Sequence, residues 1–324
     1  MQAQNEPLLK PGRVIFYNVK NLFDTINDPT TNDEDFLPEA KDQWNTKKYQ
    51  TKLQHIARVI TTMCDTVQPL VIGLCEIENK KVLEDLLAQP ALKKYNFGIV
   101  HHDSPDERGI DVALLYNKDL LEEVFDATLK VEFSFDKNDR TRDILYFKAY
   151  AGEEFPIWFF VDHWPSRREG KEESDPKRLA TSKILKAKIE NIFLGEPYSR
   201  IVVMGDFNDN PTDESLLNLS TGKVKLPEHQ TMVNLMKPLF DKKEFTIRHM
   251  SDSSIFDQFI VSKNLLDSNN QYSVSNGAAH IFNPTWLLFN HPKWGMIPNR
   301  TYAGGKYVGG YSDHLPVYFD LIFK

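Results

Sequence analysis

Short apolar runs alternate with amphipathic stretches along much of the chain. The runs at residues 13–19, 70–75, 157–161 and 201–204 are rich in β-branched and aromatic residues, which is typical of strands buried on both faces. Between the first two runs, residues 46–67 place apolar side chains at intervals of four and three, and this spacing predicts an amphipathic helix that covers a sheet. The alternation therefore predicts an α/β fold.

The remaining pattern extends this prediction. Ser174, Asp175 and Pro176 form a typical helix start, and no repeat or linker divides the chain, so we expect a single domain over residues 1–324 with a flexible N-terminus at 1–11. Residues 263–310 are rich in Pro, Gly and aromatic residues and predict a long loop at a substrate rim. The other expected elements are helices at 80–87, 174–193 and 213–219, strands at 108–116, 255–262 and 317–323, and a hairpin of 131–135 with 144–149.

Polar side chains recur where the predicted strands end, which is where α/β proteins build their sites. Glu76 alone is compatible with a salt bridge to a neighbouring helix or with a metal ligand, since a carboxylate beside a buried strand needs a partner. Gly205-Asp206-Phe207-Asn208 alone is compatible with a capped turn or with water activation by Asp206. The strand-end positions as a group favour the functional interpretation; they are Asn18, Glu76, His163, Asp206, Asn208, Asp313 and His314.

Composition limits the classes of function. The 41% apolar and 12% aromatic content is sufficient for a core, and the formal net charge of −7 disfavours non-specific nucleic-acid binding unless metal ions and a local basic rim hold the phosphate. Two cysteines, Cys64 and Cys75, exclude a disulfide-rich scaffold and a Cys-rich zinc site. No apolar run is long enough for a transmembrane segment. The first four residues resemble an added start before a mature N-terminus, which predicts a removed leader and a periplasmic or secreted protein.

Several motifs together resemble one known family. They are Leu-Cys-Glu-Ile-Glu-Asn, Arg-Gly-Ile-Asp-Val-Ala-Leu-Leu-Tyr, Thr-Arg-Asp, His-Trp-Pro-Ser-Arg, Gly-Asp-Phe-Asn and Ser-Asp-His-Leu-Pro-Val. In this order they resemble the endonuclease/exonuclease/phosphatase superfamily, whose fold is DNase I-like, over nearly the whole chain. The His-Trp-Pro-Ser-Arg form is similar to a bacterial branch of secreted nucleases. The resemblance implies a four-layer α/β sandwich, with two mixed sheets packed face to face and helices outside.

The resemblance also implies roles for the strand-end residues. It implies a metal site with Glu76 as principal ligand and with Asn18 and Asp313 close to the ion, which suits Mg²⁺ or Mn²⁺, with Ca²⁺ as an alternative, because all the donors are oxygen. It implies that Asp206 activates the attacking water. The other implied roles are phosphate binding by Asn208, His163 and Arg142, and a histidine pair of His163 with His314, the latter polarised by Asp257.

Two positions depart from the family pattern. Lys20 stands where an acid is usual, so the metal pocket lacks one carboxylate and gains a cation that could weaken ion binding or contact the phosphate. Asp162 stands where Asn commonly precedes the histidine. The family implies a metal-dependent phosphoesterase, expected to be a monomer and a nuclease on DNA or RNA. The alternatives are a phosphatase or phospholipase C-type enzyme on inositol phosphates, sugar phosphates or sphingomyelin-like lipids, and a catalytically weak binding protein.

Overall fold

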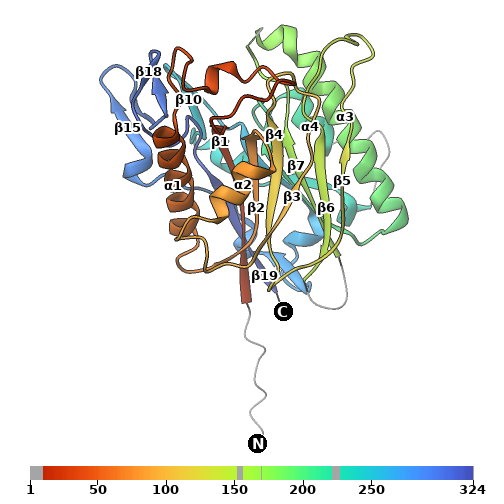
Figure 1. Ribbon diagram of the computed structural model, residues 1–324. Helices are drawn as coiled ribbons and strands as arrows, with labels where there is room; N and C mark the ends of the chain where they lie inside the picture. The colour runs from red at the N-terminus through yellow and green to blue at the C-terminus, as the bar shows by residue number, and fades with distance from the viewer. Residues whose placement is uncertain (1–9, 152–155, 169, 221–226, 324) are drawn as a thin grey trace, which may run out of the picture.

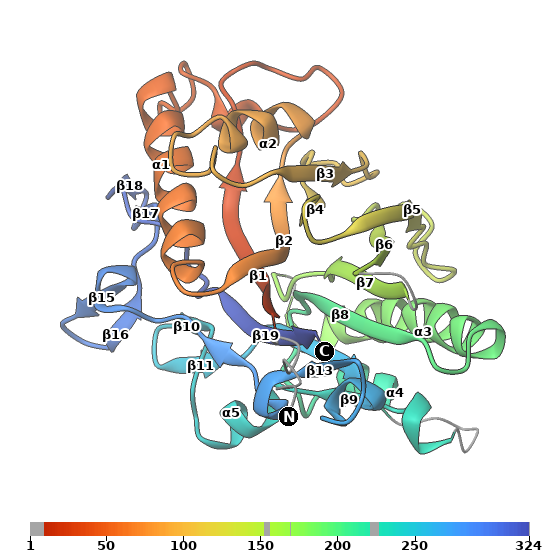
Figure 2. The same cartoon turned by 90° about the horizontal axis from the view of Figure 1, so that it is seen from below.

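Two β-sheets pack face to face, and helices cover their outer surfaces (Figures 1 and 2). The structure is a computed structural model that describes residues 10–151, 156–168, 170–220 and 227–323, so most of the predicted flexible N-terminus lies outside the described residues. Figure 2 shows α1 and α2 on one side of the sheets and α3 and α4 on the other. The predicted four-layer sandwich is therefore confirmed.

The first sheet is organised around β1 (Lys10–Leu22), which runs parallel to β2 (Gln68–Ile77) and antiparallel to β19 (Val317–Phe323). Its strand order is β13-β19-β1-β2-β4-β3, and β14 also pairs with β19. Because β1 and β2 are parallel, Asn18 and Glu76 reach the same edge of the sheet. The other strands are β3 (Phe97–His101), β4 (Asp111–Asn117), β13 (Tyr272–Val274) and β14 (His280–Ile281).

The second sheet has the order β5-β6-β7-β8-β12-β9. Its central strands β7 (Pro156–His163) and β8 (Arg200–Asp206) are parallel, and β12 (Asp257–Ser262) is antiparallel to β8. The ends of β7 and β8 therefore lie beside the start of β12. The outer strands are β5 (Glu122–Leu129), β6 (Ile144–Tyr150) and β9 (Met232–Asn234).

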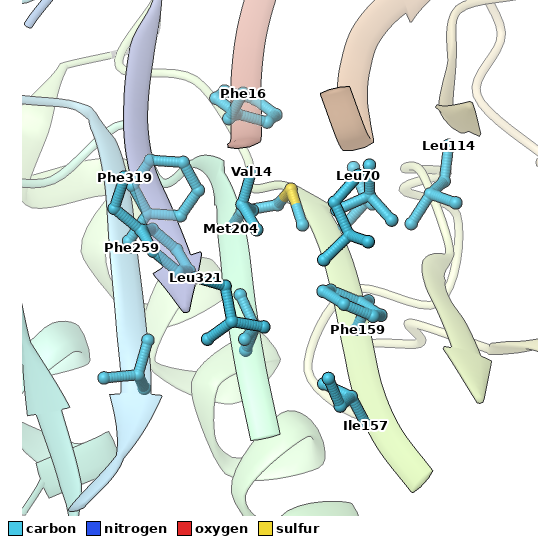
Figure 3. Close-up of a cluster of buried hydrophobic side chains, with 14 of the residues drawn as sticks. Val14, Phe16, Leu70, Leu114, Ile157, Phe159, Met204, Phe259, Phe319 and Leu321 are labelled. Carbon is cyan, nitrogen blue, oxygen red and sulfur yellow. The ribbon is translucent and has the colours of Figure 1, made fainter. Parts of the chain in front are cut away.

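The main core fills the space between the sheets (Figure 3). Val14 and Leu70 from the first sheet face Phe159 and Met204 from the second, and all four side chains are fully buried. Burial of large apolar side chains supplies most of the folding free energy. It also fixes the two sheets against each other, so that their strand ends meet along one edge.

Two further apolar clusters attach the helices. α1 (Thr46–Met63) and α2 (Lys80–Leu87) cover the first sheet, and α3 (Lys171–Gly195) and α4 (Glu214–Ser220) cover the second. The side chains of Asn45 and Asn79 cap α1 and α2 by accepting backbone N–H bonds. None of the helices in the described ranges is long and apolar enough to cross a membrane.

Three local expectations differ from the structure. β6 pairs with β5 rather than with residues 131–135, because residues 122–129 supply a longer edge strand. β3 was not expected from the sequence. α3 begins at Lys171 rather than at Ser174, because Arg178 donates to the carbonyl of Lys171 (3.1 Å) and so ties down an earlier first turn.

The segment 263–310 is not one irregular loop. It contributes β13 and β14 to the first sheet and adds small hairpins, because its apolar residues pack on β19 and beside α1. Figure 2 shows these hairpins at the edge of the molecule next to α1. The remaining elements are α5 (Lys237–Asp241) and the pairs β10 (Ile247–His249) with β11 (Asp252–Ser254), β15 (Leu288–His291) with β16 (Gly295–Pro298), and β17 (Tyr302–Ala303) with β18 (Lys306–Tyr307).

Candidate active site

Two aspartates and one histidine lie side by side on three neighbouring strands of the second sheet. In the strand register, Asp206 pairs with His163 of β7 on one side and with Asp257 of β12 on the other. Gly205 makes this close approach possible, because a β-carbon at that position would lie 2.5 Å from the carbonyl oxygen of Asp162. In the Gly205-Asp206-Phe207-Asn208 segment the turn occurs at Asn208, which adopts a positive φ of 51°.

The residues His163, Asp206, Asp257 and His314 form what we call the histidine side of the site. His314 Nδ1 lies 2.7 Å from Asp257 Oδ2, and the Nε2 atoms of His314 and His163 each lie 3.7 Å from Asp206 Oδ2. All four side chains are buried. Because 3.7 Å exceeds a direct hydrogen bond, both Nε2 atoms remain available to a third group.

The two histidines differ in charge. Burial opposes the charged form of His314, but attraction to Asp257 and Asp206 outweighs it and raises the pKa of His314 to about 10. Burial lowers the pKa of His163 well below its usual value, and the nearby Arg142 and Arg108 lower it further. At neutral pH the site therefore holds one imidazolium and one neutral imidazole.

The pKa of Asp206 is raised toward neutral pH. Burial raises the pKa of Asp206 to about 6, assisted by Asp257 and opposed by His314 and by hydrogen bonds from Asn18 and Asn208. A carboxylate with this pKa is ionised at neutral pH and is basic enough to accept a proton from water. The backbone N–H of Asn208 donates to Asp206 Oδ1 (3.0 Å), which fixes the carboxylate plane.

The residues Asn18, Lys20, Glu76 and Asp313 form what we call the carboxylate side. The amide of Asn18 donates to Glu76 Oε1 (3.1 Å) and to Asp206 Oδ2 (2.9 Å), so it joins the two sheets at the site. Glu76 has a positive φ of 62° at an irregularity in the β2–β4 ladder. Such backbone is costly for a non-glycine residue and recurs at functional sites.

Lys20 places a cation on this side. Its backbone has a positive φ of 54°, and its Nζ lies 3.4 Å from Asp313 Oδ2. Asp313 and Glu76 are the main causes of a raised pKa at Lys20. Despite burial, the charges of Lys20 and His314 lower the pKa of Asp313 to about 2, so both members of the pair are ionised at neutral pH.

The carboxylate side fits a divalent cation. Asp313 Oδ1 is buried and accepts no hydrogen bond from any residue that the structure describes. A buried carboxylate oxygen without a donor is costly unless a cation satisfies it. Glu76 supplies further carboxylate oxygens on the same side, and carboxylate oxygens are ligands that divalent cations accept. The group of Asp206, Asp257 and His314 is also compact enough to hold a metal, but Asp257 already engages the ring of His314.

Arg142 and Asn208 both contact the segment after His163. Arg142 is buried; it donates to the carbonyls of His163 (3.1 Å) and Trp164 (2.7 Å) and pairs with Asp106 (2.8 Å). Three of the five N–H donors of a guanidinium are thus directed at the protein, so Arg142 supports His163 from behind. The amide of Asn208 donates to the same Trp164 carbonyl (3.0 Å).

Sequence reasoning missed two cations that hold the site together. Lys52, almost fully buried in α1, donates to Thr301 Oγ1 (3.0 Å) and to the carbonyl of Tyr311, just before Ser312 and Asp313. The signal was its position on the apolar face of α1. Arg178 is fully buried in α3 and pairs with Asp209 (2.8 Å), beside Asn208; a lysine-rich helix surface gave no sign of it.

Comparison with known proteins agrees with this architecture. The crystal structure of an endonuclease/exonuclease/phosphatase family protein from Bacteroides thetaiotaomicron superposes with a TM-score of 0.60 at 16% identity, over 98% of this chain and 99% of that chain. The human Nocturnin catalytic domain gives 0.58 at 16% identity, over 97% and 95%. A mannosyl-6-phosphatase from B. thetaiotaomicron gives 0.59 at 16% identity, over 96% and 100%. At such identities these likenesses show the fold.

At the edge of a two-sheet sandwich, the structure brings together a buried row of acidic and histidine side chains and the carboxylates of Glu76 and Asp313. The model of the Endonuclease/Exonuclease/phosphatase family matches residues 13–322, and the chain belongs to this family. No curated protein matches the chain.

Proposed function

We propose that the chain is a Mg²⁺- or Mn²⁺-dependent phosphodiesterase that cleaves DNA or RNA. The observation that carries the proposal is the position of Asp206 Oδ2, which lies 3.7 Å from the Nε2 atoms of His163 and His314. A base and two ring nitrogens thus converge on one small volume. This is the arrangement that attack of water on a phosphate requires.

In this proposal the histidine side carries the proton transfer. Asp206 accepts a proton from the attacking water, because its raised pKa keeps it ionised yet basic at neutral pH. His314 donates a hydrogen bond from Nε2 to a phosphate oxygen and stabilises the negative charge that develops there. Asp257 holds the ring of His314 through Nδ1 and keeps it cationic.

His163 and Asn208 flank the same volume. His163 is neutral, so its ring presents one N–H donor and one acceptor, and Arg142 fixes its backbone carbonyl. We assign phosphate orientation to His163 and Asn208. Glu76 and Asp313 would hold the divalent ion, with Asn18 beside them, and the ion would neutralise phosphate charge.

A second candidate function is a phosphatase on a sugar or inositol phosphate. The net charge of −7 favours it, because an acidic surface repels long polyanions. The fold neighbour named as a mannosyl-6-phosphatase agrees with this candidate. Both candidates use the same site, and they differ in whether the phosphate bears one ester or two.

The decisive experiment measures hydrolysis of bis-p-nitrophenyl phosphate with Mg²⁺ or Mn²⁺. We expect turnover that chelation by EDTA abolishes and metal restores. Asp206→Ala and His314→Ala should each lower kcat by at least about a hundredfold, since each removes a proton-transfer or charge-stabilising group.

The control is His280→Ala. It removes an exposed histidine of β14 that stacks on Tyr318 of β19, and it should keep wild-type kcat. Turnover close to wild type in Asp206→Ala and His314→Ala would contradict the proposal. A panel of plasmid DNA, RNA, mannose 6-phosphate and inositol phosphates then separates the two candidates.

A further inference from the structure

A basic cavity adjoins the histidine side and takes no part in the proposed chemistry. It has a volume of about 290 Å³ and is lined by the loop before β4, the loop before β6, the turn after β7 and the start of α3. Pro165 and Ser166 of its wall directly follow the His163 segment. Arg142 lines the cavity while donating to the carbonyl of His163, so one guanidinium connects the cavity to the site.

The cationic groups of the cavity exceed the carboxylates that pair with them. Asp106 is the single partner of two guanidiniums, Arg108 (3.1 Å) and Arg142 (2.8 Å). Arg140 donates to the carbonyl of Lys137 (3.2 Å) and has no carboxylate partner among the described residues. Arg168 likewise has no carboxylate partner among the residues that the structure describes. The lining also holds the carboxylate of Glu107 and the pair of Lys177 with Asp139 (3.0 Å), so five cationic side chains face three carboxylates in a protein that is acidic overall.

A buried hydroxyl in the cavity wall lacks a partner. Thr141 is 3% exposed, and its Oγ1 forms no hydrogen bond with any described residue. Thr141 lines the cavity between Arg140 and Arg142. A buried hydroxyl without a partner is costly, and a ligand oxygen can satisfy that of Thr141 only after a small movement of the cavity wall. Guanidinium groups and a hydroxyl are the donors that proteins use for phosphate.

Charge effects place the cavity near the reacting groups. Positive charges of Arg142 and Arg108 act on His163, adding to the lowering of its pKa by burial. One substrate molecule could therefore occupy both the cavity and the site.

We propose that this cavity, with Arg140, Arg168 and Thr141, binds a second phosphate group of the substrate, next to the phosphate that is hydrolysed. The inference rests on the proposed phosphoesterase function and deepens it: the substrate carries at least two phosphates. Such a substrate is an oligonucleotide or a sugar bisphosphate, and both present the same anion to the cavity.

The test compares substrate pairs that differ by one phosphate. The pairs are the dinucleotide pTpT with TpT, and glucose 1,6-bisphosphate with glucose 6-phosphate. We expect the wild type to show at least tenfold higher kcat/KM for the two-phosphate member of one pair, expressed mainly in KM. The pair that shows this preference identifies the source of the phosphate. No preference in either pair would overturn the proposal.

Variants locate the effect. Arg140→Ala, Arg168→Ala and Thr141→Val should each reduce the preference at least threefold, and Arg140→Lys should retain more of it than Arg140→Ala. Lys183→Ala, which removes an exposed charge of α3 outside the cavity, should leave the ratio unchanged. A preference that survives Arg140→Ala and Arg168→Ala would also overturn the proposal.

A binding measurement separates this inference from the proposed function. Titration calorimetry in the Asp206→Ala background compares pTpT with TpT, and glucose 1,6-bisphosphate with glucose 6-phosphate, without turnover. Tighter binding of a two-phosphate ligand, lost on adding Arg168→Ala, supports the cavity even if the wild type hydrolyses nothing. Hydrolysis of bis-p-nitrophenyl phosphate with equal binding within both pairs supports the function and rejects the cavity.

Discussion

The histidine side and the carboxylate side of the candidate site are neighbours with opposite constructions. On the histidine side, Asp257 and His314 form a direct pair, and Asp206 receives hydrogen bonds from two asparagines. On the carboxylate side, Asp313 keeps a buried oxygen without a donor, and the cation beside it, Lys20, is the more exposed partner of a 3.4 Å pair.

This difference matches the different task proposed for each side, proton transfer on the histidine side and cation binding on the carboxylate side. Proton transfer requires groups whose positions and pKa values are already set before substrate binds, and rigid hydrogen-bonded strand ends provide this. Cation binding requires ligand oxygens that the protein has not already satisfied. Positive φ occurs at Glu76 and Lys20 on the second side, and also at Asn208 beside Asp206, so both sides contain backbone that is costly for these residues.

The largest expected effect comes from removing the fixed charge on the histidine side. Asp257→Asn should lower kcat by roughly 10²–10⁴-fold, because the ring of His314 loses the partner that orients and charges it. In the wild type, kcat/KM should rise with pH as Asp206 ionises near pH 6 and fall as His314 deprotonates near pH 10. Asp257 raises the pKa of His314, so its removal should move the limb near pH 10 to lower pH.

The pH–rate profile and histidine NMR titration measure this shift. Asp252→Asn removes an exposed carboxylate from β11 and serves as the matched control, with an unchanged profile. If Asp257→Asn lowered kcat while the limb near pH 10 stayed in place, Asp257 would have only a packing role.

A smaller effect is expected on the carboxylate side, where Lys20 competes with a metal ion for Asp313 and Glu76. Lys20→Met should tighten Mg²⁺ or Mn²⁺ binding about tenfold and Lys20→Glu about a hundredfold, since each unit of charge at this range is worth about 1–2 kcal/mol at a partly exposed site. Titration calorimetry measures the affinities.

The control for net charge is Lys47→Glu, at an exposed position on α1. Equal affinities in wild type, Lys20→Met and Lys20→Glu would place Lys20 outside the ion pocket.

The same contrast explains what the sequence could predict. The core strands and α1 follow from apolar spacing, because burial acts on each position in the same way along an element. The strand-end residues could be singled out because a carboxylate or histidine at the end of a buried strand needs a partner, and the structure brings Asn18, Glu76 and Asp206 into contact. The positive φ of Glu76 and the shared use of Asp106 by two arginines depend on contacts between distant segments, and no local pattern encodes them.

Lys52 and Arg142 show the limit most clearly. The residue type of Lys52 predicts a solvated side chain although its position lies on the apolar face of α1, and Lys52 is buried because two acceptors from residues 301 and 311 reach it. Arg142 was expected to contact phosphate, and its carbonyl partners at residues 163 and 164 became visible only with the fold. Tertiary hydrogen bonds override side-chain preference at both positions.

The last expected effect is on stability rather than on activity, and it concerns Asp162, which lies behind the histidine side. It is fully buried, its Oδ1 accepts from Trp164 Nε1 (2.8 Å), and its Oδ2 has no partner among the described residues. Burial raises the pKa of Asp162 to about 7. The folded chain therefore holds a proton that the unfolded chain releases near pH 4, so stability should fall as the pH rises from about 4 to 7 and stay at its lower value above that.

Asp162→Asn keeps the acceptor for Trp164 and removes the ionisable group. It should remove the contribution of Asp162 to the pH slope, at most about 4 kcal/mol, and should stabilise the fold by only about 1 kcal/mol above pH 7, because the new amide N–H₂ needs acceptors of its own. Urea unfolding at pH 5, 6, 7 and 8 measures both effects. The exposed variant Asp252→Asn should keep the wild-type slope; an equal slope in Asp162→Asn would mean that Asp162 is ionised throughout, and the neutral state assigned to it behind His163 would be wrong.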